Sequence, residues 1–102
     1  MVKVLLICTS GISTQKVVEN MQAYVEKNKI DVEVLAIGDL EKKDRIPLAD
    51  IILLGPQIRY TLEDVKSLSK GKLVLVMNTQ DFGLLRGDLI LKDALETYRL
   101  LV

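Results

Sequence analysis

VLLICTSGIST, residues 4–14, joins an apolar run to a loop of small and hydroxylated residues. The run Val2–Ile7 is apolar apart from one lysine and rich in β-branched residues, which predicts a buried strand. Apolar residues recur at roughly helical spacing over residues 13–27, which predicts a helix. The opening of the chain is therefore a strand, a short loop and a helix, and Cys8, the only cysteine, lies where the strand ends.

The same alternation continues along the chain. Apolar runs predict three more strands, at residues 31–37, 51–54 and 73–77. Further helices are expected over residues 61–69, with Gly71 as a stop, and from about Gly87 to the end, while residues 41–45 predict a solvated loop or a short helix. Nearly all-apolar strands that alternate with helices indicate an α/β fold. We expect one domain over residues 1–102, with a small doubly wound sheet of four parallel strands and helices on both faces.

Ligands of such sheets bind beyond the carboxyl ends of the strands, where the strand order reverses. This rule brings together three predicted loops, at residues 8–13, 55–60 and 78–83. The first loop leads into a helix, whose N-terminus offers free N–H groups and a partial positive charge. Gly11 permits a backbone that turns several N–H groups inward, and Ser13 or its neighbour is a suitable N-cap. The loop therefore predicts a phosphoryl-binding site.

Cys8 lies at the edge of this predicted site. The same N–H groups are expected to lower its pKa and favour the nucleophilic thiolate. The alternative is that a cysteine at the end of a buried strand is only a small apolar core residue.

Composition excludes several kinds of function. Fourteen basic and fourteen acidic side chains balance, which argues against a nucleic-acid partner. The absence of histidine excludes a histidine base, a phosphohistidine on this chain and His-based metal sites, and with a single cysteine no metal site is expected. No cofactor is expected either. A single cysteine and the lack of a signal peptide fit a reducing cytosol, and no apolar run is long enough to span a membrane.

Known phosphate loops differ from this one. G-x-x-x-x-G-K-[ST] and G-x-G-x-x-G are both absent, because Gly11 is the only glycine of the loop. Low-molecular-weight cysteine phosphatases resemble the strand, loop and helix, but they carry an arginine six residues after the cysteine, where this chain has Thr14. An arginine there stabilises the transition state of hydrolysis. Its absence favours a site that holds a phosphoryl group and passes it on.

Three segments resemble the sugar-specific IIB components of the bacterial phosphotransferase system, of the lactose, cellobiose and chitobiose group. They are VLLICTSGIST, then ADIILLGPQIRY at residues 49–60, and DFGLLRG at residues 81–87. The resemblance implies a cytoplasmic phosphoryl carrier, held at the inner face of the membrane through its permease. A phosphohistidine on a IIA partner donates to Cys8, and the group then passes to a sugar at the IIC permease. The sugar implied is a β-glucoside-type disaccharide such as cellobiose, chitobiose or lactose.

The resemblance also implies roles for individual residues. Cys8 is the nucleophile, and the phosphate-binding loop comprises Thr9, Ser10, Gly11, Ile12, Ser13 and Thr14. Gln57, Arg59 and Phe82 are candidates for the rim of the site. Relatives often have tyrosine at the position of Phe82, and Arg59 is equally compatible with a solvated loop charge.

Two other functions fit part of the pattern. A flavodoxin-like module that binds flavin mononucleotide also has a Ser/Thr/Gly-rich loop after its first strand, and Tyr60 and Phe82 would flank the flavin. That function gives Cys8 no role. A cysteine phosphatase of low activity is the third alternative.

Overall fold

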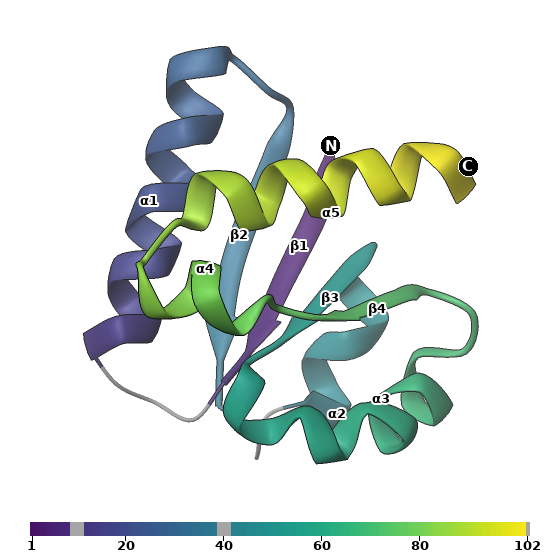
Figure 1. The fold of residues 1–102 in the computed structure, drawn as a ribbon. Coiled ribbons are helices and arrows are strands. Elements are labelled where there is room, and N and C mark those ends of the chain that lie inside the picture. Colours follow the sequence, from purple (N-terminus) through teal and green to yellow (C-terminus); the bar gives the residue numbers. More distant parts are fainter. Residues whose placement is uncertain (9–11, 39–41, 102) are drawn as a thin grey trace.

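A computed structural model of the chain describes residues 1–8, 12–38 and 42–101. Four parallel strands form one sheet in the order β2-β1-β3-β4 (Figure 1). The strands are β1 (Val2–Ile7), β2 (Val32–Ile37), β3 (Ile51–Leu54) and β4 (Leu73–Val76). The helices are α1 (Ile12–Asn28), α2 (Lys42–Arg45), α3 (Leu62–Ser69), α4 (Thr79–Gly83) and α5 (Gly87–Leu101), with 3₁₀ turns η2 (Ile46–Leu48) and η3 (Pro56–Thr61). The predicted four-stranded parallel α/β fold is confirmed.

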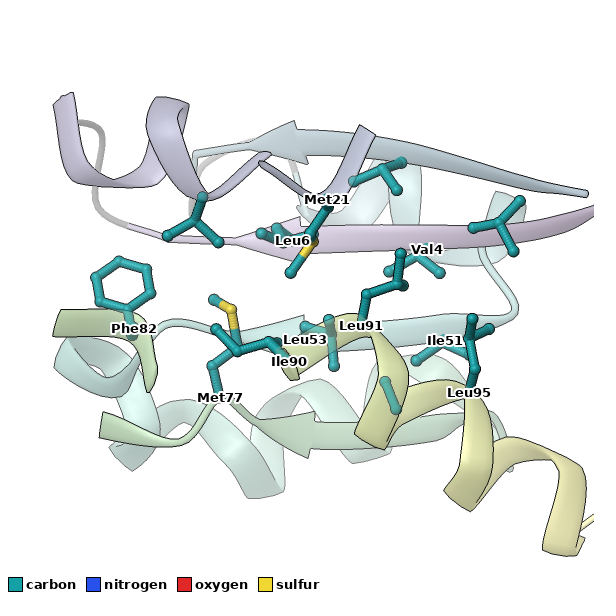
Figure 2. Close-up of a cluster of buried hydrophobic side chains, with 14 of the residues drawn as sticks. Val4, Leu6, Met21, Ile51, Leu53, Met77, Phe82, Ile90, Leu91 and Leu95 are labelled. Carbon is teal, nitrogen blue, oxygen red and sulfur yellow. The ribbon is translucent and has the colours of Figure 1, made fainter. Parts of the chain in front are cut away.

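Helices cover both faces of the sheet because successive side chains of a strand point to opposite faces. On one face, alternate residues of β1 and β3 pack in a cluster with α1, α4 and α5 (Figures 1 and 2). On the other face, the intervening residues pack against η2, η3 and α3. Since both faces are covered, β3 is buried at every position, which explains its unbroken apolar run.

The α1/α5 cluster extends to the carboxyl edge of the sheet. Figure 2 shows Phe82 at that end of the cluster, while Leu95 lies at the other end. Cys8 belongs to the same cluster as Phe82 and Met77. The sheet order puts the carboxyl ends of β1 and β3 side by side, so the reversal of strand order lies next to Cys8.

Helices α1 and α5 approach each other closely at Gly87. A Cβ atom at this position would lie 2.3 Å from the carbonyl oxygen of Val17 and 2.9 Å from the amide nitrogen of Met21. The preceding turn is held by the side-chain amide of Asn20, which donates to the carbonyl oxygen of Leu85 at 2.6 Å. Leu85 has a left-handed φ of 60°. These contacts fix α1, which follows the predicted phosphate loop, against the turn between α4 and α5.

Several predicted boundaries need correction. Two of the three predicted loops contain short helices, η3 after β3 and α4 after β4. Ser13 lies in the first turn of α1 rather than before it, because the helix begins at Ile12. The stop of α3 is the left-handed residue Lys70, with Gly71 following at a φ of 92°. The sequence 41–45 forms α2 over the part that the structure describes.

Candidate functional site

Cys8 lies at the carboxyl end of β1, between the ends of β2 and β3. Its amide donates to the carbonyl oxygen of Ile37 at 3.3 Å, which extends the pairing with β2 by one residue. The amide of Gly55 donates to the carbonyl oxygen of Ile7 at 2.9 Å, which extends the pairing with β3. The backbone on both sides of Cys8 is thereby fixed. Strand alternation directs its side chain to the face covered by α1 and α5.

The thiol of Cys8 is almost fully buried, with 1% of the residue exposed. Burial raises the pKa of this thiol above its ordinary value, because a thiolate is poorly solvated there. Hydrogen bonds from the side chain of Thr14 and from the backbone of Gly55 act in the opposite direction but are weaker. The prediction of a lowered pKa is therefore wrong for this structure. Cys8 is held as a neutral thiol close to groups that stabilise its anion.

Thr14 is placed over Cys8 by the first turn of α1. The helix begins at Ile12, so its first turn starts four residues after the cysteine. The Thr14 side chain is half-buried and forms a hydrogen bond with the Cys8 thiol. Where the phosphatases have arginine, this chain therefore has a neutral hydroxyl in contact with the Cys8 thiol.

The turn after β3 brings Gly55 and Gln57 to the same place. A Cβ atom at Gly55 would lie 3.1 Å from the Sγ atom of Cys8 and 2.7 Å from the Oε1 atom of Gln57. A side chain at position 55 would therefore displace the flexible end of Gln57 and lie in tight contact with the thiol. The structure thus joins residues from the first and second predicted loops at the thiol.

The other predicted site residues are placed as follows. Thr9, Ser10 and Gly11 lie outside the described residues, as does the side chain of Ile12. Ser13 is exposed in the first turn of α1.

The candidate rim residues differ in exposure. Gln57 and Arg59 are exposed on η3. Phe82 is 5% exposed and belongs to the buried cluster that contains Cys8 (Figure 2), so its ring faces the core.

Sequence reasoning missed α4, the helix that holds Phe82. Its N-cap is Asn78, whose Oδ1 accepts a hydrogen bond from the amide of Asp81 at 2.9 Å. A capping residue followed three positions later by an acidic residue is a recognisable start signal. It was overlooked because the helix is only five residues long.

The residues that the structure describes contain neither a candidate metal site nor a candidate membrane-spanning helix. Within residues 1–8, 12–38 and 42–101, no group of three or more acidic or cysteine side chains is arranged to hold a metal ion. Over the same ranges, no helix combines the length and the apolar character needed to cross a membrane.

Comparison with known proteins gives a consistent result. Residues 3–93 match the family model of the lactose/cellobiose-specific IIB subunit of the phosphotransferase system (PTS). The PTS galactose-specific EIIB component and the PTS cellobiose-specific EIIB component, from two subspecies of Lactococcus lactis, are each 32% identical over 87% of this chain and 89% of their own length. The oligo-beta-mannoside-specific EIIB component of Bacillus subtilis is 33% identical over 65% of this chain and 64% of its own.

Solved structures agree with these relatives. The cellobiose-specific IIB protein of Borrelia burgdorferi has a TM-score of 0.80 and 26% identity, and the match covers 96% of this chain and 92% of that one. The lactose-specific IIB domain of Streptococcus pneumoniae has a TM-score of 0.83 over 93% of this chain and 95% of that one, and at 18% identity it supports the fold alone. The chain therefore belongs to the lactose/cellobiose-specific IIB family and is a sugar phosphotransferase component of the PTS.

Proposed function

We propose that Cys8 is the residue on which this IIB component carries its phosphoryl group. The observation that carries the proposal is the position of the thiol, which lies at the carboxyl edge of β1 and is hydrogen-bonded to Thr14 and Gly55. Cys8 is also the only thiol of the chain, which has no histidine to take the group instead. The loop from Thr9 to Thr14 is proposed to bind the phosphoryl oxygens.

Two displacements at phosphorus complete the cycle. In the first, the sulfur of Cys8 attacks the phosphorus of a phosphohistidine on a IIA protein. The S–P bond forms, the P–N bond breaks, and its electron pair returns to the imidazole nitrogen. In the second, a sugar hydroxyl attacks the phosphorus of phosphocysteine, the S–P bond breaks and the thiolate is released. The hydroxyl proton is lost to solvent or to a base of the permease.

The raised pKa of Cys8 fits the first step. Burial keeps the thiol protonated at neutral pH, so the proton must leave as the S–P bond forms. The departing imidazole is a base of suitable strength for that proton. Thr14 and Gly55 are hydrogen-bonded to the sulfur and stabilise the negative charge that develops on it. The partner that donates the phosphoryl group thus also removes the proton.

A β-linked disaccharide, such as cellobiose, chitobiose or lactose, is the proposed acceptor class. The relatives named for cellobiose and oligo-beta-mannosides support a β-glycoside, whereas the relative named for galactose, a monosaccharide, does not. The partners are a IIA phosphohistidine protein and a IIC permease, which would bring this chain to the inner face of the membrane. Sugar choice is proposed to reside in the permease.

Phosphoryl transfer from a IIA protein charged with phosphoenolpyruvate and the general phosphotransfer proteins tests this function. Mass spectrometry of wild type should show one added phosphoryl group, on the peptide containing Cys8. Cys8→Ser should show none under the same conditions. A wild-type chain that stays unmodified, or a Cys8→Ser variant that is still labelled, contradicts the proposal.

A further inference from the structure

We propose that the side-chain amide of Gln57 donates a hydrogen bond to the phosphoryl group on Cys8, and that Gly55 keeps the space between them open. This inference rests on the proposed function, because it assigns a further phosphoryl-binding residue to the same site. It concerns the turn after β3, whereas the phosphate loop follows β1.

Cys8 and Gln57 lie close enough together for one phosphoryl group to be bound to the first and to contact the second. The Sγ atom of Cys8 and the Oε1 atom of Gln57 lie 3.1 Å and 2.7 Å from one shared point, the Cβ position of Gly55, so at most 5.8 Å separates them. A phosphoryl group on sulfur carries its oxygens two bonds outward, and a charge-assisted hydrogen bond spans about 2.8 Å more. The carboxamide therefore lies at a suitable distance for a phosphoryl oxygen.

The chemistry of Gln57 suits a carrier. A carboxamide has two N–H donors on the nitrogen next to its oxygen, and rotation about the last side-chain torsion exchanges the two atoms. Gln57 is exposed, so this rotation needs no repacking of the core. The amide is neutral, and so are the described groups that shift the pKa of Cys8, which are the Thr14 side chain and the Gly55 backbone. A neutral donor holds the phosphoryl dianion without the guanidinium charge that promotes hydrolysis.

The presence of glycine at position 55 is explained by the limited room for a side chain there, rather than by an unusual backbone conformation. Its φ of −61° and ψ of 145° are accessible to every residue type. A methyl group here would instead displace the flexible carboxamide of Gln57 and lie in tight contact with the thiol of Cys8. Glycine at this position therefore serves the approach of these two side chains.

The equilibrium constant for phosphoryl transfer between a IIA protein and this chain tests the inference. Gln57→Ala should lower it about tenfold, because a hydrogen bond to a charged group is lost. Gln57→Glu should lower it further, since a carboxylate repels the phosphoryl group. Gln22→Ala, which removes an exposed glutamine of α1, is the matched control and should leave it unchanged.

Glycine variants test the second half of the inference. Gly55→Ala should lower the same constant by at least threefold. Gly83→Ala is the control, because a Cβ atom there meets nothing within 4 Å. Urea unfolding of each variant separates a loss of binding from a loss of the fold.

The possible outcomes distinguish a failure of this inference from a failure of the proposed function. Wild-type protein that takes up no phosphoryl group on Cys8 overturns the proposed function and the inference with it. Normal wild-type transfer with a constant for Gln57→Ala within twofold of wild type overturns the role of Gln57 alone. Equal constants for Gly55→Ala and Gly83→Ala overturn the role of Gly55.

Discussion

At the amino edge of the sheet, charged side chains form hydrogen bonds within the chain, whereas the described hydrogen-bond partners of the thiol at the carboxyl edge are neutral. At the amino edge, the amide of Lys3 donates to the carboxylate of Asp50 at 2.8 Å, and the N-terminal amine lies 3.4 Å from a carboxylate oxygen of Asp31. The ammonium of Lys72 donates to the carbonyl oxygens of Pro47 and Ala49.

The carboxyl edge differs in the groups that surround its functional side chain, Cys8. There the thiol of Cys8 meets the hydroxyl of Thr14 and the backbone of Gly55, and both of these described partners are neutral. One edge already has partners for its polar groups within the chain. At the other edge, the Cys8 thiol is the proposed acceptor of a phosphoryl group. We expect the groups at the amino edge to contribute to stability and the surroundings of Cys8 to phosphoryl transfer, and variants at each edge should separate these two contributions.

Phe82→Ala should give the largest effect, because it removes a buried ring from the carboxyl end of the core. Large-to-small core substitutions of this kind cost about 3–5 kcal/mol in the free energy of unfolding. Less burial should also move the pKa of Cys8 back towards its ordinary value. Urea denaturation measures the first effect, and the pH dependence of iodoacetamide alkylation measures the second.

Tyr60→Ala serves as the control for Phe82→Ala, since Tyr60 is 81% exposed. It should leave both stability and alkylation close to wild type. A Phe82→Ala protein as stable as wild type would show that the cluster does not depend on this ring.

Lys72→Met should act on stability alone. The variant loses the hydrogen bonds to the carbonyl oxygens at the end of η2, at a cost of about 1–3 kcal/mol in the free energy of unfolding. Phosphoryl transfer and the alkylation rate of Cys8 should not change, because Lys72 precedes β4 at the opposite edge. Lys92→Met, at an exposed position of α5, is the matched control. A change in transfer without a change in stability would contradict the separation of the two edges.

Thr14→Val should give the smallest effect, confined to the thiol. The hydroxyl of Thr14 lowers the pKa of Cys8, so its removal should raise that pKa further. Less thiolate is then present at pH 8, and alkylation should slow by up to about tenfold, as expected for one hydrogen bond. The slowing should disappear at a pH above both pKa values.

Thr97→Val controls for this change, because the Thr97 hydroxyl bonds to the carbonyl oxygen of Asp93 on α5, away from the site. Faster alkylation of Thr14→Val at pH 8 would mean that Thr14 shields the thiol rather than stabilising its anion.

Sequence patterns predicted the elements that are long or wholly apolar. Val2–Ile7 and Ile51–Leu54 have the predicted boundaries, because strands buried on both faces are nearly all apolar, with Lys3 as the one polar residue of the two. The carboxyl-edge position of Cys8 followed from parallel strands and the loop rule. Short elements were missed: α4 and η3 have few residues, and tertiary packing rather than local propensity stabilises them.

By itself, the sequence determined the parallel α/β fold, the end of β1 as the place of the only thiol, and the lack of an arginine at Thr14. These follow from the order of residues, since periodicity and position along a strand are local properties. The tertiary structure alone decided the burial that raises the pKa of Cys8, the closeness of Gln57 to the thiol and the limited space for a side chain at position 55. Each of these depends on how residues from distant segments are packed, because burial and contact distance are set by the whole fold.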